Sequence, residues 1–514
     1  MHTLTGTTAP GGPPGAAPLR IVERLSELLF KPAAAAERRW FYAGLCTLIA
    51  AGCLSLGVSQ HTITFPLDDA YITMHNAQVL LSGTDKNYPG VPALTGATSQ
   101  VHLAIVAALM LVFSPLVASY TAGSIAIVLY TAGLARLAFQ NGGSAVFATI
   151  IIALGILTGY APYQLLNGLE TGLAMAAVTW ALVFATSPAR IKALPLLCGV
   201  LPFIRPELAA LAALLMARQV WLRCQAGDGA RPIILDFALV AVAAAPWICW
   251  TWWSIGTLLP PTAQAKAVFF AEAGLPARTK LAMVWEGLSQ AGILPLILTS
   301  LILRPNLLRL SLWFFVLAFI ASFFIALPGG TSHNWSRYDY ALLPVFLCML
   351  VGASAWRPFV GCILLVLSLV GVLHSPKALA EYADEVEFTR GSSAVAMSWA
   401  GQNIPPNAPV LIHDAGYVAF ATNLHLVDLV GLKTPESVGY HRSLTAATGG
   451  RLRGQAVSEI AQRFHAKYAI ILNDGAYYWA SLSDDLRQQG WTLTPILMPQ
   501  SRHGYIIYRL AQPH

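Results

Sequence analysis

Long apolar runs recur along most of this chain, and they constrain its fold more than any other feature. Of its 514 residues, 56% are hydrophobic and only 11% are charged, whereas soluble domains carry roughly 25% charged residues. A helix needs about 20 apolar residues to cross a bilayer. Runs near that length are predicted at about 40–59, 120–139, 143–160, 170–187, 192–204, 207–222, 233–254, 288–303, 310–327, 340–356 and 358–374. The sequence therefore predicts a polytopic α-helical membrane protein with about 11 spans.

Two segments differ from these predicted spans. Residues 100–114 form a shorter apolar run that ends at Ser114-Pro115, which favours a re-entrant or interfacial helix. Residues 1–39 are rich in Ala, Pro and Gly and carry five basic residues ahead of the run at 40–59. That run is too long for the apolar core of a cleaved signal peptide, so it is predicted to be a retained signal anchor. Residues 1–39 are then a cytoplasmic tail.

The positions of basic residues predict the orientation. If residues 100–114 do not span the membrane, the basic turns all fall on the side of the N-terminus, which the positive-inside rule assigns to the cytoplasm. These turns contain Arg136, Arg190, Lys192, Arg218, Arg231, Arg304, Arg309 and Arg357. The same count places residues 60–99 and 375–514 on the outer face. We therefore expect a protein of the bacterial inner membrane with an extracytoplasmic, periplasmic face that carries these segments.

Charge and cysteine content exclude several other classes. Residues 375–514 hold 11 basic and 11 acidic residues, so the net charge of +7 lies entirely upstream and is explained by anchoring at the membrane. No basic patch for nucleic acid is visible. The seven cysteines lie in predicted spans or a short loop and show no zinc-binding spacing, so no disulfide framework or zinc site is predicted.

The predicted outer face gathers the polar residues that are unusual for such a chain. Acidic side chains are expensive beside hydrocarbon, so they indicate a partner charge, a metal or a reaction. The polar segments contain Asp68-Asp69, Asn167 to Glu170, Arg205-Pro206-Glu207, Leu258 to Lys266, and Gly329 to Asp339. Two basic residues, Lys266 and Arg337, then face several carboxylates across one surface, which suits a site for an anionic group such as phosphate.

Each of these segments also has a purely structural explanation. Asp68-Asp69 could cap an amphipathic helix, and Glu170 could favour the positive end of a helix. Arg205-Pro206-Glu207 could simply break a helical hairpin. Lys266 and Arg337 could anchor span ends at the lipid headgroups. The sequence leaves these alternatives open.

Residues 375–514 have a different character. Short apolar runs at Pro409 to Ile412, Tyr468 to Leu472 and Tyr505 to Tyr508 alternate with helical patterns at Gln455 to Phe464 and Leu482 to Gln489. This alternation predicts a small α/β domain. The segment Asp414 to Tyr417 follows a predicted strand and is either a sugar-binding loop or an ordinary strand-end turn.

Taken in order, the motifs resemble one membrane family. They comprise Asp68-Asp69-Ala70-Tyr71-Ile72-Thr73, Thr95 to Ser99, Gly168-Leu169-Glu170-Thr171, Arg205-Pro206-Glu207, Gly256 to Pro260 with Lys266, Gly329-Gly330 through Arg337 to Pro344, and Asp414-Ala415-Gly416 with Val427 to Leu432. The series resembles the C-type (GT-C) membrane glycosyltransferases, and within them the terminal β-(1→2)-arabinofuranosyltransferases of cell-wall arabinan. The pattern departs from that subfamily at His75-Asn76, Thr95 and Thr331, which leaves the sugar and the acceptor open.

The resemblance implies a GT-C transmembrane domain at 40–374 with an outer catalytic loop at 60–99, followed by a periplasmic domain at 375–514. It implies a polyprenyl-phosphate sugar as donor, arabinofuranose or a related pentose or hexose, and a cell-envelope glycan or glycoprotein as acceptor. Asp68 and Asp69 are the expected catalytic pair, one for the acceptor hydroxyl and one with an orienting role.

The remaining candidate residues bind the substrates. Lys266, Arg337 and Arg205 are the candidates for the donor phosphate, and Tyr71, His75, Glu170, Glu207 and His333 are the candidates for substrate binding. The histidines lack metal-ligand spacing, and a divalent cation remains an open question. The alternative function is a transporter or glycolipid flippase, although no internal repeat of the kind common in transporters is visible.

Overall fold

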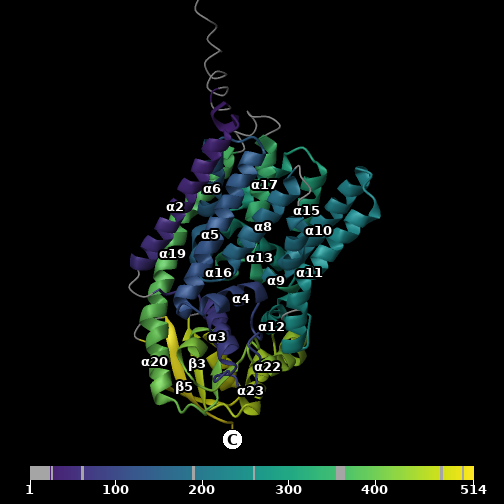
Figure 1. Ribbon diagram of the computed structural model, residues 1–514. Coiled ribbons are helices and arrows are strands. Elements are labelled where there is room, and N and C mark those ends of the chain that lie inside the picture. The colour runs from purple at the N-terminus through teal and green to yellow at the C-terminus, as the bar shows by residue number, and fades with distance from the viewer. Residues whose placement is uncertain are drawn as a thin grey trace, which may run out of the picture.

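The computed structural model describes Arg24 and residues 27–59, 63–187, 192–258, 261–354, 365–474, 478–499 and 503–513. A bundle of helices forms the larger part, and the C-terminal residues fold against one end of it as a sheet with flanking helices (Figure 1). The cytoplasmic tail predicted at 1–39 and the span predicted at 358–374 lie partly outside the described residues.

The helical part consists of elements that match most of the predicted apolar runs. Its helices are α2 (Ala35–Ser59), α3 (Asp68–Ser82), α4 (Gln100–Leu109), α5 (Pro115–Gln140), α6 (Ala145–Leu157), α7 (Ala161–Leu166), α8 (Thr171–Thr186), α9 (Ala193–Ile204), α10 (Leu208–Gln225), α11 (Ala230–Ile255), α12 (Thr262–Phe270), α13 (Ala277–Gln290), α14 (Leu294–Leu301), α15 (Leu307–Ala326), α16 (His333–Ser336), α17 (Leu343–Ser354) and α19 (Ser375–Phe388). Helices α3, α4 and α12 lie where the bundle meets the C-terminal domain (Figure 1).

Four described helices are long and apolar enough to cross a membrane. They are Ala35–Val58, Pro115–Gln140, Ala230–Ile255 and Leu307–Ala326. The bent pair α13 and α14 makes a fifth if it counts as one span. Helix α4 has ten residues, which at 1.5 Å per residue is about half of the hydrocarbon thickness. The apolar helices indicate a membrane protein, and the figure of about 11 spans remains a prediction.

The run at 288–303, predicted as a span, contains a sharp bend near its start. Helices α13 and α14 meet at an angle of 97°. Gly292 lies at the break with φ of 69°, a left-handed conformation that glycine adopts without steric cost. A Cβ on Gly159 would lie 2.1 Å from the carbonyl oxygen of Ala291. The chain turns here because two glycine-containing backbones pack directly against each other.

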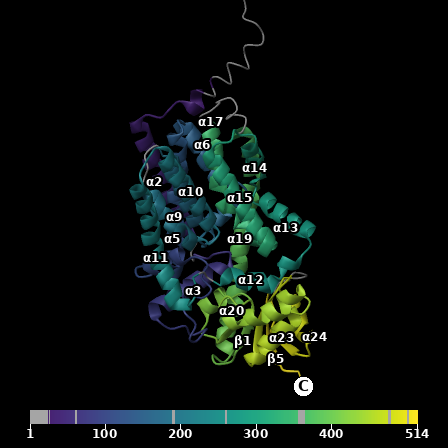
Figure 2. The same ribbon diagram turned by 90° about the vertical axis from the view of Figure 1, so that its right-hand side faces the viewer.

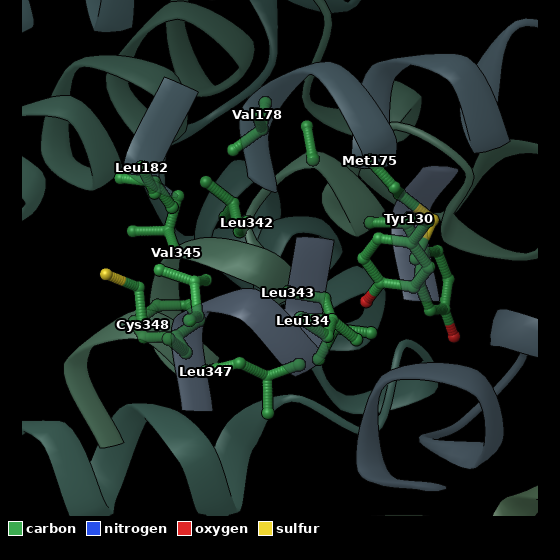
Figure 3. Close-up of a cluster of buried hydrophobic side chains, with 14 of the residues drawn as sticks. Tyr130, Leu134, Met175, Val178, Leu182, Leu342, Leu343, Val345, Leu347 and Cys348 are labelled. Carbon is green, nitrogen blue, oxygen red and sulfur yellow. The ribbon is translucent and has the colours of Figure 1, made fainter. Parts of the chain in front are cut away.

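The core of the bundle is formed by α5, α8 and α17. Leu134, Leu182 and Val345 from these three helices are fully buried, and they belong to the cluster drawn in Figure 3. Helices α5 and α8 approach closely at Gly133, where a Cβ would lie 2.7 Å from a methyl carbon of Thr179. Small residues at such contacts are typical of membrane helices, which associate by close packing.

The C-terminal sheet has five strands in the order β2-β1-β3-β5-β4. Strand β1 is parallel to β2 and β3, whereas β5 is antiparallel to β3 and β4. The elements are β1 (Val410–Ile412), β2 (Leu426–Asp428), β3 (Tyr468–Asn473), β4 (Thr492–Leu497) and β5 (Gly504–Ala511), with α20 (Ala394–Asn403), α21 (Tyr417–Ala421), α22 (Pro435–Tyr440), α23 (Arg453–Arg463) and α24 (Ser481–Gln488).

The predicted small C-terminal sheet is confirmed, including strands at β1, β3 and β5 and helices at α23 and α24. Strands β2 and β4 were not predicted. Strand β2 has only three residues, and β4 lies at the edge of the sheet, is largely exposed and contains Pro495. Neither strand therefore shows the apolar alternation that marks a half-buried strand.

A continuous helical segment connects the two parts. Helix α19 packs on the bundle, where the Tyr382 hydroxyl donates to the carbonyl of Leu166 at 3.3 Å. The π-helical turn Thr389–Ser393 follows, and then α20 lies beside the sheet (Figures 1 and 2). The segment therefore runs from one part into the other without a flexible linker.

Candidate active site

A polar cavity of about 290 Å³ lies between the helical bundle and the C-terminal domain. Its walls come from the first turn of α3, from α12, α16 and α19, and from the segments that follow β1 and β3. The polar residues that line it include Asp68, Asp69, Lys266, His333, Asn334, Glu385, His413 and Asp414. The cavity thus unites residues from the outer segments that the sequence had placed on one face.

Asp69 is the centre of a charged cluster in this cavity. Its Oδ2 lies 2.7 Å from Nη1 of Arg337 and 3.4 Å from Nζ of Lys266. Burial alone would raise the pKa of Asp69, but Lys266 and Arg337 outweigh it and hold that pKa below its usual range. Asp69 is therefore an ionised carboxylate held between two cations.

His333 lies beside the same cluster without carrying a charge. Burial, together with the neighbouring Lys266, lowers the pKa of His333 to about 3. Its imidazole is therefore neutral at physiological pH, and the positive charge beside Asp69 belongs to Lys266 and Arg337.

Arg337 is held from behind by a second buried arginine. The Nη1 of Arg205 donates to the carbonyl oxygen of Arg337 at 3.3 Å, and its Nη2 lies 2.6 Å from Oε1 of Glu207. The Nη2 of Arg337 donates to the Tyr338 hydroxyl at 3.1 Å. A small cavity of about 20 Å³ is lined by both Arg337 and Glu170. Arg205 therefore supports the position of Arg337.

The backbone that precedes Arg337 is strained. Asn334, Trp335 and Ser336 have φ of 49°, 58° and 60°, so three consecutive non-glycine residues are left-handed. Each such residue costs on the order of 1–3 kcal/mol and persists only where the surroundings hold it. Here the Nε2 of Gln164 donates to the carbonyls of Asn334 and Trp335 at 2.8 and 3.0 Å.

Further contacts hold the same left-handed turn. The ring of Trp335 stacks on Tyr160, with centroids 4.8 Å apart and planes at 10°. Its Nε1 donates to Glu385 at 2.7 Å, and the hydroxyl of Ser336 donates to the carbonyl of Gly287 at 3.0 Å. The turn is fixed from several sides, and it directs Asn334 and Arg337 toward Asp69, with the Nδ2 of Asn334 at 3.5 Å from Oδ2.

Asp68 connects α3 to the C-terminal domain. Its two oxygens accept the backbone N–H groups of Gly416 and Tyr417 at 2.7 and 2.6 Å, at the first residues of α21. A Cβ on Gly416 would lie 1.9 Å from the backbone oxygen of Asp68, so only glycine fits. Burial and the nearby Asp414 raise the pKa of Asp68 well above its ordinary value. The Asp68 side chain therefore caps a helix of the other domain.

Asp414 supplies a further carboxylate from the C-terminal side of the cavity. Its Oδ2 accepts the Tyr505 hydroxyl at 2.7 Å, and its Oδ1 lies 3.1 Å from Nδ1 of His413. The His413 ring stacks on Trp479 at 4.2 Å between centroids, and its Nε2 accepts the backbone N–H of Leu472 at 3.0 Å. The segment after β1 is thus part of the cavity wall.

A second, apolar cavity of about 340 Å³ opens on the other side of Lys266. Its lining includes Phe323, Ala326 and Leu327 at the C-terminal end of the candidate span α15. Thr98, Pro206, Glu207, Thr262, Ala263, Ala267, Ser322 and Tyr338 complete it. Lys266 therefore lies at the junction of a polar cavity and an apolar one that reaches a membrane helix.

The structure places the candidate residues in different positions. Asp68, Asp69, Tyr71, Lys266 and His333 line the polar cavity. Glu170 and Arg337 line the small adjoining cavity, and Glu207 lines the apolar one. The remaining candidate, Arg205, lies behind Arg337 and does not line these three cavities.

His75 does not line these three cavities, and its contacts lie elsewhere. Its Nε2 lies 3.4 Å from Asp85 and 3.2 Å from Oδ1 of Asn87. Asp85 in turn lies 3.4 Å from Nζ of the buried Lys433. His75 thus belongs to a polar junction between α3 and the C-terminal domain.

The described residues do not bring together three or more His, Cys, Asp or Glu side chains that could hold a metal ion. The carboxylate best placed in the cavity, Asp69, is already paired with two cations. The divalent cation that the sequence left open therefore has no preformed ligand set in the described part of the chain.

Several residues in or around the cavity were not singled out from the sequence. Gln164, Trp335 and Glu385 act through contacts with residues 50 to 171 positions away, and no local motif marks such contacts. The left-handed conformation of Asn334 to Ser336 was equally invisible, since these residues carry no glycine. Of these residues, only Glu385 carries a possible signal, because it is a charged residue within a helical pattern.

Comparison with known proteins identifies the architecture. Residues 380–508 match a family described as a domain of unknown function, DUF8728. No curated protein matches the chain. ArnT from Cupriavidus metallidurans in the apo state is 14% identical, with a TM-score of 0.52 over 91% of this chain and 98% of ArnT. ArnT bound to undecaprenyl phosphate gives 12% identity and a TM-score of 0.51, over 90% of this chain and 98% of ArnT.

The arabinofuranosyltransferase AftD from mycobacteria is also similar, at 17% identity and a TM-score of 0.43, over 94% of this chain and 41% of AftD. The two ArnT structures define the fold, because each is covered almost completely. The chain therefore has the fold of the GT-C membrane glycosyltransferases, with a small C-terminal sheet domain.

Proposed function

We propose that this protein transfers a sugar from a polyprenyl-phosphate donor to a cell-envelope glycan or glycoprotein acceptor. One observation carries the proposal: Lys266 lines both the polar cavity that contains Asp69 and the apolar cavity that reaches α15. A lipid-linked phosphate has a charged head joined to an apolar chain. The two adjoining cavities match those two parts.

The donor phosphate is assigned to Lys266 and Arg337. Charge-assisted contacts to phosphate are among the strongest hydrogen bonds in proteins, and the planar guanidinium of arginine can make two at once. The prenyl chain is assigned to the apolar cavity beside Phe323 and Leu327. The similarity in fold to ArnT bound to undecaprenyl phosphate supports the assignment.

The transfer step assigns roles to the charged residues. The acceptor hydroxyl attacks the anomeric carbon of the sugar while the bond from that carbon to the phosphate oxygen breaks. The phosphate leaves with the electron pair, and Lys266 and Arg337 stabilise its charge. Asp69 accepts the proton of the hydroxyl. A phosphate that binds Lys266 and Arg337 weakens their hold on Asp69, which raises its pKa toward that of a useful base.

Asp68 receives a different role from its neighbour. Because both of its oxygens accept backbone N–H groups of the C-terminal domain, we assign it to holding that domain over the cavity. Asp414 lies opposite and is assigned to orienting the acceptor. The sugar is arabinofuranose or a related pentose or hexose, and the reaction is placed on the periplasmic face of the bacterial inner membrane.

The experiment measures donor binding and turnover with the full-length protein in lipid nanodiscs. Undecaprenyl phosphate is the probe, and native mass spectrometry reports its binding. Lys266→Ala should weaken binding about tenfold to hundredfold, as expected for the loss of a charge-assisted contact. Phe323→Trp, which fills the apolar cavity, should weaken it as well.

The matched control is Lys467→Ala, since Lys467 is an exposed lysine of the C-terminal domain. A protein that binds undecaprenyl phosphate equally well in all four forms does not have the proposed donor site. Mass spectrometry of envelope glycans from a strain without this chain identifies the sugar and the acceptor. A strain whose glycans lack a sugar while the lipid-linked form of that sugar is retained on the cytoplasmic face would instead identify a flippase.

A further inference from the structure

A third cavity, of about 420 Å³, lies on the outer side of the helical segment that connects the two parts. Its walls are formed by the end of α19, the beginning of α20 and the strands β4 and β5. The residues that line it include Asp384, Glu387, Phe388, Val395, Leu497 and Tyr505. We call this cavity the outer groove. Its volume is in the range of sites for small organic ligands, about 300–1,000 Å³.

The outer groove adjoins the polar cavity of the candidate active site. Phe388 and Tyr505 line both cavities, and their ring centroids are 6.4 Å apart. The Tyr505 hydroxyl also donates to Asp414 within the polar cavity. These two aromatic rings are therefore shared by the polar cavity and the outer groove.

The π-helical turn Thr389–Ser393 also contributes residues to both cavities. Thr389 and Ser393 line the polar cavity, whereas Gly391 and Ser392 line the outer groove. Short π-helical insertions in helices are rare and often lie at functional sites, because the wider turn redirects side chains. Here the extra residue lets consecutive side chains face two different cavities.

We propose that the outer groove is a distal acceptor subsite, which holds the part of an acceptor glycan that lies beyond the sugar being modified. This inference rests on the proposed function and adds the route by which the acceptor reaches Asp69. A glycan whose end sits in the polar cavity continues past Phe388 and Tyr505 into the outer groove.

The chemistry of the outer groove fits a sugar chain better than the other candidates. Asp384 and Glu387 lie three residues apart on one face of α19, and their oxygens can accept hydrogen bonds from sugar hydroxyls. The aromatic rings offer apolar faces for the carbon side of a sugar ring. Among the described residues that line the groove, both charged ones are acidic, which disfavours anionic lipid headgroups and anionic glycans.

Strand β5 packs directly against the π-helical turn beside the outer groove. A Cβ on Gly504 would lie 2.6 Å from Pro499 and 2.7 Å from Oγ of Ser392. The strand therefore contacts the turn directly, and the groove remains open beside Val395, which is 55% exposed. A larger side chain at Val395 would fill the groove without entering the core.

The test uses the full-length protein in nanodiscs and oligosaccharides released by mild acid from the envelope of a strain without this chain. Saturation-transfer NMR measures their binding, and mass spectrometry measures sugar transfer to fragments of different length. The variants are Val395→Trp and the double variant Asp384→Asn/Glu387→Gln. The control is Ser398→Trp, an exposed position one turn further along α20 that does not line the groove.

Both groove variants should lower binding of the longer fragments and transfer to them about tenfold or more, while transfer to a monosaccharide changes less than about twofold. Ser398→Trp should behave as the wild type. An unchanged dependence on fragment length in the folded Val395→Trp protein overturns the proposal. A loss confined to a peptide acceptor also overturns it, because the occupant is then a polypeptide.

The same measurements separate this inference from the proposed function. A wild-type protein that binds no undecaprenyl phosphate contradicts the donor site. If it nevertheless binds the longer fragments in a manner that Val395→Trp abolishes, the outer groove is a glycan site in a protein with another activity.

Discussion

Replacing Asp68 by Asn should loosen the C-terminal domain rather than act first on the chemistry. Asp68 accepts two backbone N–H groups, from Gly416 and Tyr417, at 2.7 and 2.6 Å. An asparagine offers one oxygen and turns an NH₂ group toward the second donor. A buried N–H without an acceptor costs about 1–3 kcal/mol, and each 1.4 kcal/mol is about tenfold. We therefore expect the amides of Gly416 and Tyr417 to exchange about 5- to 150-fold faster.

Hydrogen exchange read by mass spectrometry measures this directly, because local opening sets the exchange rate of such amides. The adjacent variant Asp69→Asn is the matched control, since Asp69 contacts Arg337 and Lys266 instead of the C-terminal domain. It should abolish sugar transfer while leaving the exchange of 416–417 unchanged. Gly416→Ala should accelerate exchange as Asp68→Asn does, because its Cβ would lie 1.9 Å from the Asp68 oxygen. Wild-type exchange rates in Asp68→Asn would refute the reasoning.

Three further predictions follow from individual contacts. Arg337→Lys keeps a charge but loses the paired contacts to Asp69 and Tyr338, so donor turnover should fall about tenfold in a donor titration. An unchanged titration would contradict the assignment of the donor phosphate to Arg337. Gln164→Ala removes both donors to the left-handed turn and should lower the free energy of unfolding by about 1–3 kcal/mol, which a stability equal to that of the wild type would exclude. Burial lowers the pKa of His441 to about 4, below its unfolded value of about 6.5. The contribution of His441 to the free energy of unfolding is therefore complete above pH 6.5, and about 3 kcal/mol of it is lost as the pH falls to about 4. Thermal melts across this range should show the loss. The His441→Gln variant should not show it.

Much of the architecture could be predicted from the sequence, because it depends on local patterns. Apolar runs near the length of a bilayer require helices in lipid, since a helix satisfies its own backbone hydrogen bonds. The strands β1, β3 and β5 were recognisable as short apolar runs between helical patterns. The grouping of the polar segments was also predicted, from the parity of the expected spans. The number and the orientation of those spans stay predictions.

The sequence was less informative where an element depends on its neighbours. The 97° break between α13 and α14 arises from the contact of Gly292 with Gly159, more than 130 residues away in the chain. Strand β4 exists because β5 pairs with it. The pattern of a segment indicates whether that segment is buried, but it does not indicate which distant segment it contacts.

The sequence by itself determined the class of protein, the gathering of its polar segments on one side, and the acidic pair at the first turn of α3. Only the tertiary structure decided which partners the two aspartates contact. Asp69 meets Arg337 across 268 residues, and Asp68 meets the backbone of Gly416 across 348. Adjacent side chains on a helix point in different directions, so two identical residues acquire different partners as soon as the surrounding elements pack. The physical reason is that local periodicity determines where helices and strands form, whereas long-range packing determines which charged groups come into contact.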